Sequence, residues 1–163
     1  MERIMIIGAP GAGKTWLAGQ VSVKLGLPVI SVDQFVHDRG GKLRPADTID
    51  QDVRAAAELP RWIIAGGNTR TYGDRVARAD CVIRLKLPRL LRLWRLWRRE
   101  GVNLGLWRGA WSYERVLGDR DEAVLSAAGG IPVYDLRSAA AVQGFLRILP
   151  CPLGMGASPM GKG

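Results

Sequence analysis

The sequence predicts an α/β fold in which a five-stranded parallel sheet carries helices on both faces. Five short apolar runs alternate with segments of helical periodicity, and a glycine-rich turn joins the first run to the first helix. Parallel neighbours need crossover connections, so this alternation favours a sheet between two helical layers. With 163 residues and 47% hydrophobic content, the chain suits one packed core and is too short for two ordinary domains.

The predicted strands are short apolar runs that end in glycine, proline or polar residues. They are residues 3–7, 29–32, 62–65, 81–85 and 131–136. The third run leads into Gly66-Gly67-Asn68, a turn in which the backbone can approach a ligand closely. The sequence therefore predicts an accessible turn at the carboxyl end of the third strand.

Helices are predicted between the strands from apolar periodicity and from residues that start or stop a helix. They are residues 14–25, 50–58 after a polar loop at 38–50, 74–79 as a helix or turn, 89–99, 110 to about 127, and 138–149. Gly26 ends the first of them, and Pro60 ends the second. Pro88 suits the start of the fourth, and Ser138 is the expected N-cap of the last.

The helix predicted at 89–99 combines an apolar stripe with five arginines. Leu90, Leu93, Trp94 and Trp97 make the stripe, which we expect to pack inward, with most of the arginines at the surface. A glycine-containing break at 101–109 follows, and residues 98–112 approximately are predicted to form a lid. The folded domain is expected to span residues 1–149, and residues 150–163 a flexible tail.

The charge of the chain suits polyanionic partners. The net charge is +9 with a sequence pI near 10.4, and 19 of the 24 basic residues are arginine. Such a balance fits nucleic acid, but it equally fits a nucleotide enzyme that holds phosphates with arginines. A small polyanionic substrate is favoured, and a nucleic-acid partner stays open as the alternative.

Other features point to a reducing cytoplasm. No apolar run approaches the roughly 18 residues that span a bilayer, and Met1 leads directly into a strand-like segment without a leader pattern. Neither secretion nor membrane insertion is therefore expected. Cys81 and Cys151 are too few for a disulfide framework and are predicted to be inert thiols. Both a monomer and a homodimer are compatible with the sequence.

The motif that carries chemistry is Gly8-Ala9-Pro10-Gly11-Ala12-Gly13-Lys14-Thr15, which matches the phosphate-binding loop pattern without a mismatch. It lies directly after a predicted strand and directly before a predicted helix. Inward-turned backbone N–H groups and the helix dipole favour an anion there. Lys14 is positioned to reach the β and γ phosphates, and Thr15 to offer its hydroxyl to Mg²⁺. The predicted contacts to ATP are Gly8, Pro10, Gly11, Ala12, Gly13, Lys14, Thr15 and Trp16.

Five stretches in the same order resemble small bacterial adenylate-kinase-like P-loop proteins, often labelled topology modulation proteins, within the nucleoside-monophosphate and shikimate kinase group. They are Ile6 to Thr15, Leu27 to Asp33, Trp62 to Thr71, Arg78 to Pro88 and Leu136 to Leu146. The resemblance covers roughly residues 3–149, and the first stretch alone is diagnostic. It implies a three-layer P-loop NTPase fold with ATP and Mg²⁺ as ligands and a small molecule as phosphoryl acceptor.

The resemblance also implies roles for residues outside the loop. Asp33 would assist Mg²⁺ or orient an acceptor hydroxyl, although an N-cap at this position is the alternative. Asn68 and Arg70 would bind the acceptor. Arg98 and Arg99, with Arg95 as a further candidate and Arg115 as a second lid candidate, would neutralise the transferring phosphate. Arg137 would stack on the adenine.

Two departures from the family pattern bear on whether this chain transfers phosphate efficiently. Ala65 stands where many relatives have a metal-assisting acidic residue, which leaves Asp33 as the remaining carboxylate, as in shikimate-type kinases. The lid is short. The sequence therefore predicts phosphoryl transfer from ATP to a nucleotide or small hydroxy metabolite, with a nucleotide-binding regulator or DNA-associated protein of weak ATPase activity as the alternative.

Overall fold

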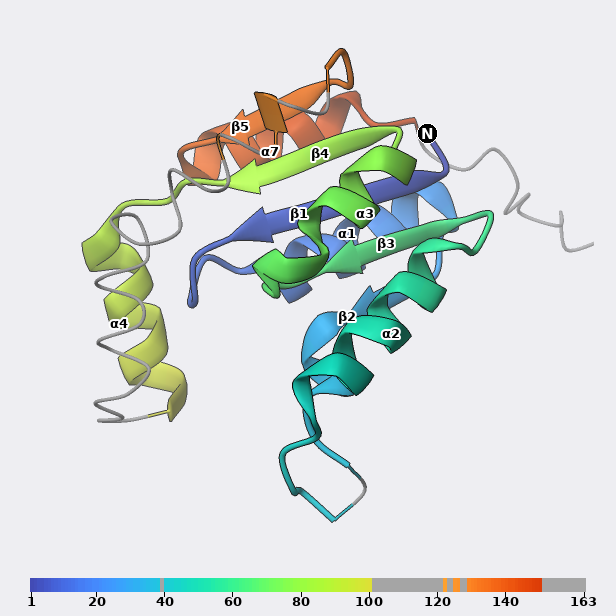
Figure 1. The fold of residues 1–163 in the computed structure, drawn as a ribbon. Coiled ribbons are helices and arrows are strands. Elements are labelled where there is room, and N and C mark those ends of the chain that lie inside the picture. Colours follow the sequence, from blue (N-terminus) through green and yellow to red (C-terminus); the bar gives the residue numbers. More distant parts are fainter. Residues whose placement is uncertain (39, 101–121, 123–124, 127–128, 151–163) are drawn as a thin grey trace, which may run out of the picture.

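Five parallel strands form a sheet in the order β2-β3-β1-β4-β5 in the computed structural model (Figure 1). The strands are β1 (Arg3–Gly8), β2 (Val29–Ser31), β3 (Trp62–Ala65), β4 (Cys81–Leu85) and β5 (Val133–Leu136). Central β1 pairs with β3 on one side and β4 on the other. The structure describes residues 1–38, 40–100, 122, 125–126 and 129–150, and only the backbone of Arg99 and Glu100.

Helices cover both faces of this sheet. They are α1 (Lys14–Leu25), α2 (Ala46–Ala57), α3 (Tyr72–Arg78), α4 (Arg89–Glu100) and α7 (Ala139–Ile148), with short 3-10 helices η1 (Val32–Phe35) and η2 (Thr69–Thr71). In Figure 1, α3 lies in front of the sheet, and α1 and α7 lie behind it. The predicted three-layer α/β fold with a five-stranded parallel sheet is confirmed.

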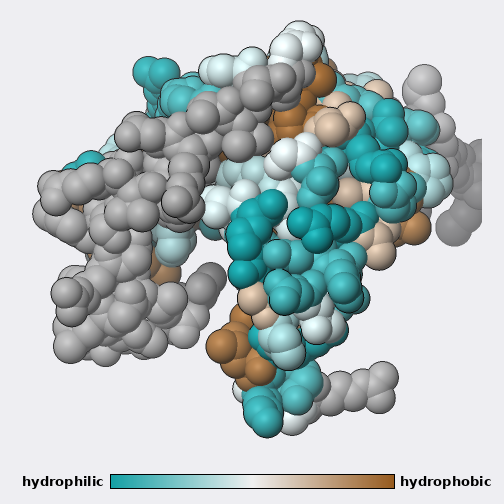
Figure 2. All heavy atoms as spheres, viewed as in Figure 1, coloured by the Kyte–Doolittle hydropathy of each residue, from teal (hydrophilic) through white to brown (hydrophobic). Residues whose placement is uncertain are grey.

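Each face of the sheet has its own apolar core. Ile4 and Ile6 of β1 belong to the core that α1 and α7 cover. Met5 and Ile7, which alternate with them, belong to the core under α2 and α3. Because a parallel strand is buried on both faces, its sequence is an unbroken apolar run rather than an alternating one. On the front face, the described side chains over α2 and α3 are mainly hydrophilic, as expected for helices that bury one stripe (Figure 2).

The largest boundary error concerns α2, which was predicted at 50–58 and begins four residues earlier, at Ala46. Pro45 precedes it as the N-cap residue, and the acidic Asp47 in its first turn complements the helix dipole. This polar first turn has the composition of a loop, which is why periodicity alone missed it. Ile49 and Val53 bury the apolar stripe against the sheet.

Smaller corrections apply elsewhere. Val32, predicted as the last residue of a strand, belongs to η1, and the last strand begins at Val133 rather than Ile131. The helix predicted at 74–79 is α3 at Tyr72–Arg78. Ser138 is confirmed as an N-cap, since its Oγ accepts a hydrogen bond from the Ala141 N–H at 3.1 Å. The predicted break at 101–109, most of the predicted helix at 110–127 and lid at 98–112, and the tail beyond residue 150 lie outside the described residues.

Helix α4 contradicts the predicted orientation of its apolar stripe. Leu90, Trp94 and Trp97 are exposed, with 78%, 51% and 52% of their surface accessible, and Leu93 is half-buried, whereas Arg92 and Leu96 are buried. The helix crosses the end of the sheet at the phosphate loop instead of covering an apolar face. The Arg92 carbonyl lies 2.7 Å from where a Cβ on Gly11 would stand. Arg92 is buried and Arg95 donates to the Ala12 carbonyl at 3.5 Å, so these two arginines lie on the inward side of α4, whereas Arg89 and Arg98 are exposed.

Candidate nucleotide-binding and phosphoryl-transfer site

The loop between β1 and α1 has the backbone geometry of an anion-binding turn. Gly11 and Gly13 have φ values of +76° and +92°, a region that L side chains rarely adopt. The Ala12 N–H closes a tight turn by donating to the Ala9 carbonyl at 3.2 Å. The first N–H groups of α1, which have no partner within the helix, point out of its N-terminus toward this turn together with the positive end of the dipole. The loop can therefore hold a phosphate chain.

Lys14 adds a positive charge at the mouth of this loop. Its Nζ donates to the carbonyls of Gly8 at 2.8 Å and Ala9 at 3.1 Å, so the side chain folds back across the turn. An ammonium group has three donors, which lets it exchange carbonyl partners for phosphate oxygens. Thr15, the next residue of α1, is exposed beside it. Backbone N–H groups, the Lys14 ammonium and the Thr15 hydroxyl are thus at the N-terminal end of α1, and their contacts to ATP and Mg²⁺ stay predictions.

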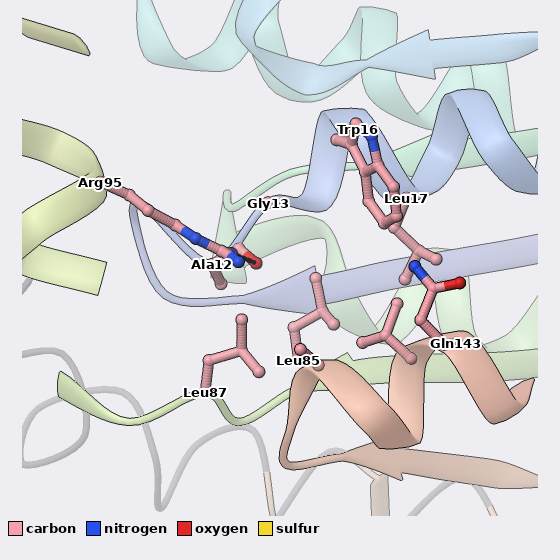
Figure 3. A pocket seen from close by; sticks show the side chains of 10 residues that line it. Ala12, Gly13, Trp16, Leu17, Leu85, Leu87, Arg95 and Gln143 are labelled. Carbon is pink, nitrogen blue, oxygen red and sulfur yellow. Dashed lines mark hydrogen bonds between the residues drawn. The ribbon is translucent and has the colours of Figure 1, made fainter. Parts of the chain in front are cut away.

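A pocket of about 350 Å³ opens beside the loop (Figure 3). Its lining consists of Ala12, Gly13, Trp16, Leu17, Leu85, Leu87, Arg95, Ala139, Val142 and Gln143. Trp16 comes from α1, Gln143 from α7 and Arg95 from α4, so three helices meet around it. Arg95 points toward the loop and donates to the Ala12 carbonyl at 3.5 Å. Apolar walls with an amide and a guanidinium at the rim suit a flat heterocycle attached to a phosphate chain.

On the other side of the loop, the fully buried Arg75 organises the turn after β3. Its guanidinium donates to the carbonyls of Gly67 at 2.7 Å, Asn68 at 2.9 Å and Gly66 at 3.3 Å, and it lies 4.7 Å above the Tyr72 ring. Arg75 was not among the predicted site residues. One feature of the sequence could have pointed to Arg75. No acidic residue lies three or four positions from it, so its partners could not be carboxylates of the same helix face.

Asn68 and Arg70, the predicted acceptor-binding residues, lie together and converge on Asp50 of α2. The Asn68 amide donates to Asp50 Oδ1 at 2.7 Å, and Arg70 Nε lies 2.9 Å from Asp50 Oδ2. Asp50 was not among the predicted site residues. Its position as a buried carboxylate follows from the earlier start of α2, which places it one turn inside the helix.

Asp33 is exposed in η1, directly after β2. The alternative interpretation of this residue as an N-cap is wrong, because Ser31 holds the N-cap position of η1. The preceding Val32 packs against the turn after β3, where its Cβ lies 2.8 Å from the position of a Cβ on Gly66. Asp33 therefore belongs to the same rim as the Gly66 turn, at the carboxyl edge of the sheet.

The arginines predicted to contact the transferring phosphate and the adenine do not lie together in the described structure. Arg98 is exposed and lies 5.5 Å from the Trp94 ring centre. Arg137 is 73% exposed and contacts Asp135, and it is not among the residues that line the pocket. Arg115 and the side chain of Arg99 lie outside the described residues. The roles assigned to these four arginines therefore stay predictions.

We searched the described part of the chain for metal-binding clusters, membrane-spanning helices and reactive thiols. Those residues contain no group of three or more His, Cys, Asp or Glu side chains that could hold a metal. No described helix combines the length and apolar character that crossing a bilayer requires. Cys81 is buried, and burial raises the pKa of its thiol to about 11, so it is protonated at neutral pH and unreactive, as predicted. Cys151 lies outside the described residues.

Comparisons with known proteins agree with the fold. No family model matches the chain. Over 91 residues it is 36% identical to a protein of Thermococcus onnurineus (strain NA1) named "Putative adenylate kinase", a match that covers 54% of this chain and 51% of that protein. The chain thus spans about half the length of this curated relative.

Solved structures of small-molecule kinases superpose on nearly the whole chain. Shikimate kinase from Acinetobacter baumannii matches with a TM-score of 0.66 at 17% identity, over 90% of this chain and 92% of that one. Deoxyadenosine kinase from M. mycoides matches with a TM-score of 0.56 at 16% identity, over 89% and 96% of the two chains. The chain therefore has the P-loop kinase fold. The partial adenylate-kinase match and these neighbours support a P-loop kinase relationship, whereas the resemblance to topology modulation proteins stays a prediction.

Proposed function

We propose that this protein transfers the γ-phosphoryl group of ATP to a small acceptor, either a nucleotide or a small hydroxy metabolite. The observation that carries the proposal is that the phosphate loop lies between a pocket and a polar turn. A base-sized pocket with Trp16 and Gln143 lies on one side, and the Gly66 turn with Asp33 lies on the other. Donor and acceptor would thus meet at Lys14 from opposite directions, as in-line transfer requires.

The residues of the loop would bind and stabilise the triphosphate. Backbone N–H groups and Lys14 would hold the β and γ phosphates and neutralise charge as the bond to the leaving oxygen lengthens. Asp33 would orient the acceptor hydroxyl and take its proton as the new P–O bond forms. Arg95, which already reaches the Ala12 carbonyl at 3.5 Å, would pair with phosphate oxygens from the α4 side.

Magnesium fits the donor set of this proposal. Mg²⁺ prefers oxygen ligands, and P-loop sites supply one or two of them while the phosphates supply others. Thr15 offers a hydroxyl and Asp33 a carboxylate, both of them exposed. When bound, the ion would supply positive charge that offsets the negative charge of the phosphates. A cytoplasmic location remains part of the proposal.

One observation favours a second candidate, a nucleotide-binding regulator with weak ATPase activity. Ala65, at the end of β3, is buried and supplies no carboxylate next to the loop. A protein of this kind would bind ATP without acceptor-stimulated turnover, and its basic charge would give salt-sensitive binding to DNA.

The test is ADP release in the presence of a panel of nucleosides, nucleoside monophosphates, polyols and hydroxy acids. We expect at least one acceptor to stimulate release, and Lys14→Ala to reduce the stimulated rate by roughly 100-fold or more. Lys24→Ala, in the last turn of the same helix, is the matched control and should keep the wild-type rate. ATP binding without any acceptor-stimulated release above the Lys14→Ala level would instead favour the regulator.

A further inference from the structure

Arg70 already uses the Nε and Nη2 edge of its guanidinium, which can bind an anion bidentately, to pair with Asp50. Nε lies 2.9 Å from Asp50 Oδ2, and Nη2 lies 3.1 Å from Asp50 Oδ1. Nη2 also donates to the Ala46 carbonyl at 3.1 Å. Two parallel N–H to oxygen contacts form the bidentate geometry in which arginine binds a carboxylate or a phosphate. The carboxylate of Asp50 thus occupies the edge through which Arg70 would bind a phosphate bidentately.

Asp50 is fixed in this position. Only 8% of its side chain is accessible, compared with 52% of the Arg70 side chain. The Asn68 amide donates a further hydrogen bond to Asp50 Oδ1 at 2.7 Å, and Asn68 is held in turn because its carbonyl accepts from Arg75 at 2.9 Å. A buried carboxylate with three donor contacts is costly to displace, so this pair differs from a mobile surface ion pair.

The neighbouring arginines of this rim are matched in the same way. Arg44 pairs with Asp52 at 2.7 Å, and Arg54 with Asp74 at 2.7 Å. Arg75 is occupied by backbone carbonyls. In the described part of the chain, the region around α2, η2 and the Gly66 turn therefore has its arginines balanced by acids or carbonyls, although the whole chain carries +9. The exposed Asp33 adds a negative charge to this rim.

We propose that the acceptor is a hydroxyl compound that carries no phosphate group, and that Asp50, by holding Arg70, is the residue that discriminates against phosphorylated acceptors. The proposal rests on the kinase function proposed above and narrows its substrate class. A phosphate dianion placed here would meet the carboxylates of Asp50 and Asp33, and like charges brought together oppose binding. A neutral polyol or nucleoside meets the same groups as hydrogen-bond acceptors for its hydroxyls.

Paired acceptors provide the test, because they differ in a single phosphate. Adenosine with AMP, and cytidine with CMP, are compared by acceptor-stimulated ADP release. Their binding is also measured by calorimetry on protein saturated with a non-hydrolysable ATP analogue and magnesium. Calorimetry needs no turnover, so it reports on acceptor charge even when the panel lacks the true acceptor. We expect the wild-type protein to bind neither monophosphate more tightly than its nucleoside.

Asp50→Asn removes the negative charge and replaces the carboxylate with an amide of the same shape that still forms hydrogen bonds. We expect it to tighten binding of each monophosphate by at least about tenfold relative to the corresponding nucleoside. Asp52→Asn, two residues along α2 in the half-buried pair with Arg44, is the matched control and should change neither affinity.

Wild-type protein that binds AMP or CMP at least tenfold more tightly than the nucleoside would overturn the inference while leaving the kinase function intact. The same holds if a folded Asp50→Asn protein gains no affinity for monophosphates. Absence of acceptor-stimulated turnover with every compound would count against the proposed function instead. The wild-type comparison decides the inference if Asp50→Asn fails to fold.

Discussion

The guanidinium of Arg84 on β4 lies against the carboxylate of Asp135 on β5, with Nε 2.6 Å from Oδ1 and Nη2 2.9 Å from Oδ2. The two residues are register partners in the parallel pair, and the Arg84 side chain is only 9% exposed. Arg84 Nη1 also lies 3.0 Å from Glu122. This contact fastens β5, and with it the start of α7, to the rest of the sheet.

We expect Asp135→Asn to lower the free energy of unfolding by roughly 2 to 4 kcal/mol, because it leaves a largely buried guanidinium without its main counter-charge. Glu58→Gln, in the exposed pair with Arg78, is the control and should cost less than about 1 kcal/mol. Urea unfolding followed by circular dichroism measures both. Equal losses in the two variants would show that the Arg84 pair stabilises no more than a surface contact.

The same pair gives the stability of the protein a pH dependence. Burial raises the pKa of Asp135, but the hydrogen bond from Arg84 and the charges of Arg84 and Lys86 outweigh it, so its pKa lies below the ordinary 3.8. A carboxyl whose pKa is lower in the folded state stabilises the protein above the unfolded pKa, and this contribution is lost as pH falls through the folded value. Below about pH 4, unfolding free energy should therefore fall more steeply in the wild-type protein than in Asp135→Asn. Parallel curves for the two proteins would contradict this assignment.

Gly11 is the point at which α4 rests on the phosphate loop. A Cβ there would lie 2.7 Å from the Arg92 carbonyl and 2.9 Å from Leu96 Cγ, at a φ of +76°. We expect Gly11→Ala to destabilise the protein by about 1 to 3 kcal/mol and to weaken ATP binding by roughly tenfold, because α4 and the loop must move apart. Thermal unfolding and calorimetric titration with ATP and magnesium measure the two effects.

Gly19, in the middle of α1, provides the comparison for Gly11. A Cβ there meets nothing within 4 Å, and the residue is helical. Gly19→Ala should therefore stabilise the protein by about 0.5 to 1 kcal/mol and leave ATP binding unchanged. If Gly11→Ala bound ATP as well as Gly19→Ala, the contact between α4 and the loop would have no part in nucleotide binding.

The phosphate loop and the strands could be predicted from the sequence because their signals are local. Gly8 to Thr15 fix the loop by residue type and spacing, and the strands are apolar runs buried on both faces. The pairing of Arg70 with Asp50 joins residues 20 positions apart, and that of Arg84 with Asp135 joins residues 51 apart. Such contacts depend on how the crossover connections bring elements together, which periodicity does not describe.

Helix α4 shows how the bounds of a helix can be predicted correctly while its buried side is predicted wrongly. Its bounds were predicted to within a residue, since Pro88 marks the start. The direction of its apolar stripe was inferred on the assumption that the helix covers a sheet face. Arg92 is instead buried and Trp94 half exposed, because the helix lies against the phosphate loop at Gly11 and not on an apolar face of the sheet. The partner surface, which one helix sequence does not contain, decides which side faces inward.

Gln143 lies on α7 at the rim of the pocket beside the loop. A larger side chain there should occupy space in a pocket of about 350 Å³ that we assign to the base of ATP. We expect Gln143→Trp to raise the Kd for ATP by roughly tenfold or more, since base contacts are lost. The Kd for magnesium tripolyphosphate, which has no base, should stay unchanged, and calorimetry measures both ligands. Arg147→Trp, exposed one turn further along α7, is the control for adding an indole. Equal weakening of ATP and tripolyphosphate by Gln143→Trp would place the damage in the phosphate loop, and unchanged ATP binding would place the base elsewhere.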